Sequence, residues 1–200
     1  MAENTIVLAS ASPARAGMLA AAGVPFAADP AAVDEASVKR AMKADGAAAD
    51  AVAEALAALK AQQVARRHPG LLVVGADQML VCGGRWFDKP GDAAEAREQL
   101  LALRGRTHEL VTAAVVVRDA EVLWHHVELA RLTVRPFTEA FLDFYLDAMG
   151  GHVRRSVGGY AVEGLGAQLF SRIEGSHYAV LGLPLLPLLD FLRGHGVIPE

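Results

Sequence analysis

The 200-residue chain has a single cysteine, Cys82, which excludes an internal disulfide framework and fits a reducing cytoplasm. Long apolar runs are also missing, since none approaches the about 18 residues that a helix needs to span a bilayer. Glu3 stands where a secretory signal would carry basic residues. Positive charge is scarce too: 19 Lys and Arg against 23 Asp and Glu give a net charge of −4, which argues against non-specific nucleic-acid binding. We therefore expect neither a membrane nor a nucleic acid as a partner.

Apolar residues make up 53% of the chain, enough for a sizeable core, and the chain has no internal repeats. Apolar runs of strand length alternate with segments of helical periodicity, and a long hairpin over residues 107–134 follows. We expect an α/β fold in one domain over residues 1–200: a mixed twisted sheet with flanking helices, and two lobes around a cleft.

The expected strands cover 5–8, 71–75, 79–82, 85–87, 107–118 and 122–134, and residues 169–173 are expected to form a short strand or a turn. The expected helices cover 13–22, 34–42, 47–67, 93–103, 139–149 and 184–195. The glycine-punctuated segment between 156 and 168 has no assigned element.

The stretch from Leu8 to Arg15 joins the first strand to the first helix. Ser12 is a good N-cap residue, and Pro13 suits the first helical position. A helix N-terminus beside the hydroxyls of Ser10 and Ser12 and the guanidinium of Arg15 is suited to an anion, most often phosphate. On this stretch alone, a capped helix with a surface arginine is the alternative.

Asp77 is the strongest candidate for chemistry. It follows the apolar run 71–75, so we expect it at a strand end that faces a cleft, where ligands bind in open α/β sheets; an aspartate that caps a turn is the alternative. Lys60 lies in the preceding helix, and Lys89 follows the next hairpin. With Arg15 they give three cations and one carboxylate, a set that suits a polyphosphate together with a metal or an activated water.

Three further positions have open interpretations. Glu35 begins a helix, and metal binding and a solvated helix start are equally open for it. Glu163 lies in a glycine-flanked turn whose backbone can approach a planar ligand closely, with an ordinary turn as the alternative. His125 and His126 have no third partner at metal-ligand spacing, so we take them as structural.

Several short motifs follow one another along nearly the whole chain. They are Leu8–Arg15, Val33–Glu35, Lys60–Ala61, Gly75–Gln78, Asp88–Pro90, Gly105–His108, Glu163–Gly166, Ile173–Ser176 and Val180–Leu185. In this order and spacing they resemble the Maf family of nucleoside triphosphate pyrophosphatases.

The resemblance implies a Maf/ITPase-like fold and a housecleaning hydrolase. Such an enzyme cleaves a nucleoside triphosphate between its α- and β-phosphates and gives a monophosphate and pyrophosphate. The resemblance also implies a divalent cation, Mg²⁺ or Mn²⁺, and a cytoplasmic homodimer. We take Asp77, Lys60 and Lys89 as catalytic, with Asp77 as the proton acceptor. Ser10, Ser12 and Arg15 are expected around the phosphates, and Asp77 and Glu35 are expected to bind the metal.

In the family, the preference for a base depends on which residues occupy the positions of Ala14, Gln78 and Glu163. The family's pyrimidine-specific branch has Arg, Thr and Gln there, and its 7-methyl-GTP branch has Trp, Gln and Glu. Two of the three positions match the second branch, so 7-methyl-GTP is the leading substrate, and the Glu163 carboxylate can accept from guanine N1–H and N2–H. Ala14 lacks the aromatic face that favours a cationic methylated base, so a dTTP/UTP-type pyrophosphatase is an alternative. Leu59 and Asp88 replace glutamates that are usual in the family.

Two other classes of protein are possible. A non-catalytic regulator of septum formation would bind nucleotide without turning it over, although the set Asp77, Lys60 and Lys89 argues against it. A structural α/β module would use its polar residues only as caps and turns, and it predicts no metal-dependent stabilisation by nucleotide.

Overall fold

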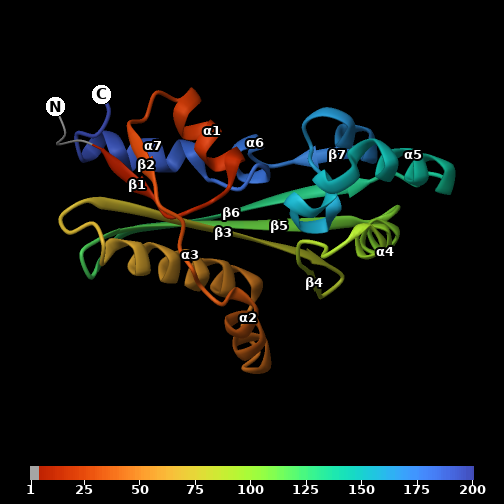
Figure 1. The fold of residues 1–200 in the computed structure, drawn as a ribbon, viewed down its shortest axis with the longest axis horizontal. Helices are drawn as coiled ribbons and strands as arrows, with labels where there is room; N and C mark the ends of the chain where they lie inside the picture. Colours follow the sequence, from red (N-terminus) through yellow and green to blue (C-terminus); the bar gives the residue numbers. More distant parts are fainter. Residues whose placement is uncertain (1–4) are drawn as a thin grey trace. The chain divides into compact units, whose positions relative to one another are not determined.

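The computed structural model of this chain describes residues 5–200, so Glu3 lies outside the described residues. Within them the chain forms a seven-stranded mixed sheet with helices packed against it. The strand order is β2-β1-β3-β5-β6-β7, and β4 pairs with β3. The expected α/β class, a mixed sheet with flanking helices, is confirmed (Figure 1).

Most of the expected elements are present with ends that differ by a few residues. The strands are β1 (Ile6–Leu8), β2 (Phe26–Ala28), β3 (Leu72–Cys82), β4 (Arg85–Phe87), β5 (Thr107–Arg118), β6 (Glu121–Val134) and β7 (Phe170–Glu174). The helices are α1 (Pro13–Ala21), α2 (Glu35–Ala44), α3 (Ala49–Ala65), α4 (Ala93–Leu103), α5 (Glu139–Met149), α6 (His177–Val180) and α7 (Leu185–Gly194). The segment without an expected element forms two short 3₁₀ helices, Val157–Gly159 and Gly164–Leu169, and a third, Gly150–Arg155, precedes it.

The chain forms two compact units. In the described residues, the first unit takes in the chain up to Gln78, then Val111–Glu128 and Ser176–Glu200; the second takes in Met79–Leu110 and Leu129–Gly175. Strands β3, β5 and β6 contribute residues to both. A single domain over residues 1–200 stays a prediction. No helix within residues 5–200 has the length and apolar character needed to cross a membrane.

In the first unit, helices cover both faces of the sheet. Helices α1 and α7 lie on one side of the strands and α3 on the other (Figure 1). Leu19 of α1 and Leu188 of α7 join the cluster of buried side chains that includes Leu8, Val74 and Val116. Because side chains alternate along a strand, the residues of β3 next to Val74 point to the α3 side.

Strand β3 is continuous through Gly75 and Asp77, so two expectations are wrong: a strand does not end at Gly75, and Asp77 does not stand at a strand end. Gly75 is a point of close packing. A Cβ atom there would lie 2.0 Å from the carbonyl oxygen of Ala57 and 2.8 Å from the amide nitrogen of Ala61, both on α3. Glycine therefore lets the α3 backbone pack directly on the strand, which is a known reason for a glycine within a strand.

The second unit contains α4, α5, the β3–β4 hairpin and the pairing of β6 with β7. Leu80 pairs with Phe87, and Leu132 pairs with Ile173, both in antiparallel register. Cys82 is buried, as a small apolar residue would be. Several polar aromatic side chains are also buried in this unit, and these are described below.

Candidate functional site

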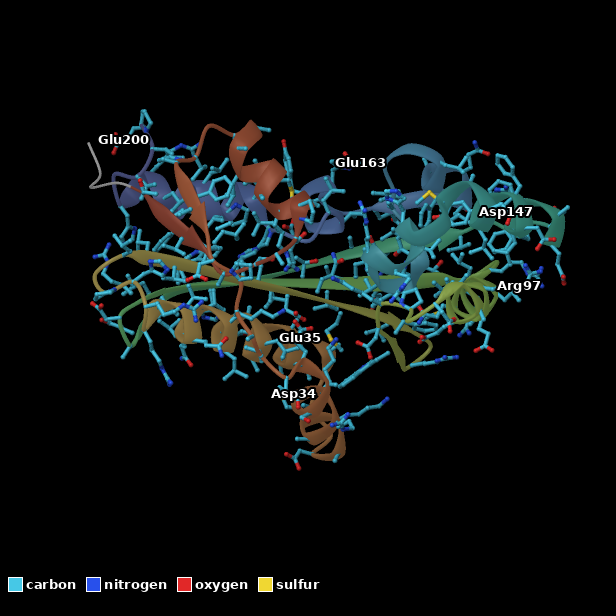
Figure 2. All side chains as sticks on the ribbon, in the orientation of Figure 1. Asp34, Glu35, Arg97, Asp147, Glu163 and Glu200 are labelled. Atoms are coloured by element: carbon cyan, nitrogen blue, oxygen red, sulfur yellow. The ribbon has the colours of Figure 1, made fainter. Side chains whose placement is uncertain are left out.

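A buried ion pair joins β3 to α3 in the first unit. Asp77 is 4% exposed and Lys60 is 8% exposed. The Lys60 Nζ atom lies 2.5 Å from Oδ1 of Asp77 and 2.7 Å from Oε1 of Glu35. Glu35 is the first residue of α2, and Figure 2 shows it beside α3. Asp77 lies two residues after Gly75, so both face α3, and the side chains of Asp77, Lys60 and Glu35 meet there.

The second carboxylate oxygen of Asp77 has no hydrogen-bond partner. Its Oδ2 atom is buried and unpartnered among the described residues, whereas Oδ1 accepts from Lys60. An unpaired buried carboxylate oxygen costs free energy, and proteins seldom keep one without a use. Oδ2 is therefore an acceptor suited to a water proton, a cation or a ligand donor.

The turn after β1 holds its hydroxyl groups in defined roles. Ser12 is the N-cap of α1, with its Oγ accepting from the Arg15 amide at 3.4 Å, and Pro13 takes the first helical position, as expected. The Oγ atom of Ser10 accepts from the Ser12 amide and from Nη1 of Arg15, both at 3.2 Å. A hydroxyl has two acceptor positions and one proton, so the Ser10 O–H proton is left to donate to a ligand.

Arg15 is largely committed to holding the protein backbone. Its Nε donates to the Gly182 carbonyl at 2.7 Å, and its Nη1 also donates to the Ala76 carbonyl at 2.9 Å. Burial lowers the pKa of Arg15, and the Asp77 and Glu35 carboxylates oppose that lowering. The interpretation of Arg15 as a surface residue is therefore wrong.

Gln78 faces the side of β3 opposite to Asp77. Its Nε2 donates to Oγ1 of Thr112 and to the Ala179 carbonyl, each at 2.9 Å, and also approaches the Val180 carbonyl at 3.3 Å. Thr112 Oγ1 in turn donates to the Ala179 carbonyl at 2.8 Å. These acceptors fix the direction of the Gln78 amide, so its Oε1 is the end turned away from them.

Two residues of this site were missed by the sequence interpretation. Thr112 is fully buried and is the one hydroxyl in the apolar run 110–117, which is the signal that would have found it. Gly182 has a φ of +101°, and a Cβ there would lie 3.4 Å from Nε of Arg15. Only glycine adopts this backbone without strain, so its place in a Leu-Gly-Leu-Pro stretch was the available signal.

The remaining predicted residues are exposed. Ala14 lies in the first turn of α1 in the first unit, whereas Lys89, after β4, and Glu163, before the last 3₁₀ helix, belong to the second. The structure thus brings Ser10, Ser12, Arg15, Glu35, Lys60, Asp77 and Gln78 into the first unit. The roles of Lys89 and Glu163 stay predictions.

The carboxylates present fit a divalent cation that is completed by a ligand. Within residues 5–200, no three His, Cys, Asp or Glu side chains are grouped to hold a metal. Glu35 and Asp77 nevertheless converge on the same Lys60 Nζ atom, and Asp77 keeps one oxygen unpartnered. Mg²⁺ is usually held by one or two carboxylates together with substrate phosphates, so this donor set matches that habit.

The family model described as Maf-like protein matches residues 5–195. The chain belongs to the Maf family. A nucleoside triphosphate pyrophosphatase of Paramagnetospirillum magneticum is 57% identical to this Maf-family chain, over 95% of it and 98% of the relative. A 7-methyl-GTP pyrophosphatase of Rhizobium meliloti is 48% identical, over 96% of this chain and 97% of the relative. The family resemblance inferred from the motifs is confirmed.

A solved structure of a nucleoside-triphosphatase / dITP/XTP pyrophosphatase from Mycobacterium abscessus covers 98% of this Maf-family chain and 98% of its own. Its sequence identity to the chain is 17% and the TM-score is 0.45.

Proposed function

We propose that this Maf-family chain is a nucleoside triphosphate pyrophosphatase, a hydrolase that releases pyrophosphate and leaves a nucleoside monophosphate. The observation that carries the proposal is the buried Asp77 carboxylate, with one oxygen on Lys60 and the other unpartnered. The names of the relatives agree with it. A protein that only binds nucleotide has no need of an unpaired buried carboxylate beside a triphosphate, because the two negative charges repel each other.

In this proposal Asp77 is the proton acceptor for the attacking water. Lys60 holds Oδ1, so the carboxylate is fixed in direction and Oδ2 receives the proton as the water oxygen bonds to the α-phosphorus. The bond from the α-phosphorus to its bridging oxygen then breaks, and pyrophosphate leaves. Charge that develops on the phosphate oxygens is stabilised by Lys60, Arg15 and the Ser10 hydroxyl of the first unit, since fixed cations and donors act most strongly where charge builds up.

Glu35 and Asp77 are the residues we propose for Mg²⁺ or Mn²⁺. When bound there, the cation would neutralise phosphate charge and orient the triphosphate. Lys60 contacts both carboxylates and keeps them close together, so a Lys60 variant should lower turnover.

For the base, we propose 7-methyl-GTP as the leading substrate. Guanine presents donors at N1 and N2, and the fixed Oε1 of Gln78 and the Glu163 carboxylate are both acceptors. Ala14 supplies no aromatic face, so pyrimidine triphosphates are the second candidate, and a substrate panel separates the two.

We also propose that the protein is cytoplasmic and a homodimer. Light scattering on purified protein tests the dimer through its mass.

The test is pyrophosphate release from UTP, dTTP, GTP and 7-methyl-GTP, with Mg²⁺, with Mn²⁺ and with chelator. Asp77→Asn keeps the size of the side chain and removes the proton acceptor, so we expect at least about 10²-fold lower kcat. Asp50→Asn on the exposed first turn of α3 is the matched control and should retain wild-type turnover. Turnover that survives in Asp77→Asn would overturn the role of Asp77. Binding of nucleotide with no turnover of any triphosphate by the wild type would favour the regulator.

A further inference from the structure

The loop Ala161–Leu169 of the second unit carries Glu163 and starts and ends beside packed aromatic residues. Tyr160 precedes the loop and is 5% exposed, and Phe170 follows it. The two rings meet edge to face, with centroids 4.9 Å apart and planes at 76°. Gly166 closes the loop on itself, because a Cβ there would lie 1.8 Å from the Ala161 carbonyl oxygen. The loop is therefore short, closed and held at its base.

His108 of β5 contacts both residues at that base. Its Nε2 lies 2.5 Å from the Tyr160 hydroxyl oxygen, and its ring centroid lies 5.5 Å from that of Tyr160 and 6.2 Å from that of Phe170. His108 is only 1% exposed. A side chain fixed in the sheet thus ties together the residues on either side of the loop.

The chemistry of this contact is that of a neutral pair. Burial lowers the pKa of His108 to about 4 and raises the pKa of Tyr160 well above 10. The Nδ1 atom of His108 is buried with no hydrogen-bond partner among the described residues. The bond between Nε2 and the Tyr160 hydroxyl is therefore the one that compensates for burying the imidazole ring. An imidazole kept neutral and desolvated for a single bond is a costly arrangement that needs a purpose.

We propose that His108 is a positioning residue that acts through Tyr160 to hold the loop Ala161–Leu169 and thereby sets where Glu163 meets the substrate base. The inference rests on the proposed function, because Glu163 needs a fixed position only if it reads a base. Glu163 is exposed on the loop and labelled in Figure 2. An exposed carboxylate can discriminate between bases only if its backbone is held still.

The decisive variant is Tyr160→Phe, which keeps the ring and its packing on Phe170 and removes only the hydroxyl that bonds His108. The control is Thr107→Val, which keeps the size of an exposed side chain of this unit and removes a hydroxyl that bonds to the Thr133 hydroxyl of β6, outside the loop. Each change is also made on a Glu163→Gln background. Amide hydrogen exchange over residues 161–169 is measured without nucleotide, and kcat and KM are measured for each triphosphate.

We expect Tyr160→Phe to speed exchange in the loop by about 10-fold and to raise KM for the preferred triphosphate by about 5- to 10-fold, the loss that one buried hydrogen bond brings. The value of kcat should stay within about twofold, because the hydrolytic groups are untouched. On the Glu163→Gln background Tyr160→Phe should leave KM unchanged, and the control Thr107→Val should leave loop exchange at the wild-type rate.

Unchanged exchange in Tyr160→Phe would overturn the proposal, and so would an equal rise in KM with and without Glu163, which would mean a general loss of structure. If the wild type releases pyrophosphate from none of the triphosphates, the proposed function fails. The exchange measurement, made without nucleotide, then decides by itself whether His108 and Tyr160 hold the loop.

Discussion

Gly75→Ala is the substitution for which the structure gives the sharpest expectation. The new Cβ would lie 2.0 Å from the Ala57 carbonyl oxygen, 2.8 Å from the Ala61 amide nitrogen and 3.0 Å from the Ala61 Cβ. The first two atoms belong to the α3 backbone, so no side chain can rotate away to relieve the contact. Strand β3 and helix α3 must move apart by roughly 1 Å, because non-bonded atoms settle at about 3.5 Å and part of the overlap is taken up by small distortions.

The expected cost follows from that separation. Overpacking a core usually costs about 1–3 kcal/mol, and a clash with backbone belongs at the upper end, about 3 kcal/mol. In a protein of this size each 1 kcal/mol shifts Tm by about 2–4 °C, so Tm should fall by about 6–12 °C. Lys60 is the neighbour of Ala61 on α3, so the same movement draws Lys60 away from Asp77 and turnover should fall in the protein that still folds.

Differential scanning calorimetry together with pyrophosphate release measures both effects. Gly17→Ala is the control, because Gly17 lies within α1 and a Cβ there would meet nothing within 4 Å. It should raise the stability by roughly 0.5–1 kcal/mol, since alanine is the better helix former. If Gly75→Ala unfolds within about 2 °C of the wild type, a shift worth less than about 1 kcal/mol, the direct packing of α3 on β3 is not as described.

Three further predictions concern the base side of the site and the response to pH. Thr112→Val removes an acceptor of Gln78 and a donor to Ala179; unfolding by urea should show a loss of about 1–2 kcal/mol, and the ratio of kcat/KM between guanine and pyrimidine triphosphates should fall. Arg67 and, next, His68 lower the pKa of Asp29 from 3.8 to about 2, so its stabilising effect is present above pH 3.8 and is lost as pH falls towards 2; Tm measured against pH should be flatter there in Asp29→Asn. Burial lowers the pKa of His108 from 6.5 to about 4, so stability should decline as pH falls from 6.5 to 4, and His108→Gln should remove part of that slope.

Each of these has its own control or contrary result. Thr112→Ser keeps the hydroxyl and should retain the wild-type base preference; a loss equal to that of Thr112→Val would show that volume matters and not the hydrogen bond. An acid slope in Asp29→Asn as steep as in the wild type would assign that slope to other carboxylates. A slope between pH 6.5 and 4 that His108→Gln leaves intact would mean that His108 is not held neutral by burial.

Local signals in the sequence predicted the helix starts well. Ser12 was expected as the cap of the first helix, and its side chain accepts from the backbone amide three residues later. Asp92 and Thr138 make the same contact at the starts of α4 and α5. Such a cap is built from neighbouring residues, so a short stretch of sequence contains all the information needed to recognise it.

The errors came where the meaning of a residue depends on distant parts of the chain. In the sequence, a glycine that ends a strand cannot be distinguished from a glycine on which a helix packs. Gly75 contacts α3 residues that lie 14 to 18 positions away. Arg15 reaches Gly182 across 167 residues, and Gln78 reaches Thr112 across 34. The sequence pointed to the site residues Asp77, Lys60 and Glu35, but the unpartnered oxygen of Asp77 is visible only once the strand is folded.

The alternation of β3 limits how this protein can diverge. Asp77 and Gln78 are neighbours in the chain but point to opposite faces of the sheet, one toward Lys60 and the other toward Thr112 and Ala179. Substitutions around Gln78 can therefore change what is recognised while the groups around Asp77 stay as they are. Insertion or deletion of one residue before Asp77 would exchange the two faces along the rest of the strand. Descendants of this sequence can vary the side chains of β3, but its length between Gly75 and Gln78 is fixed.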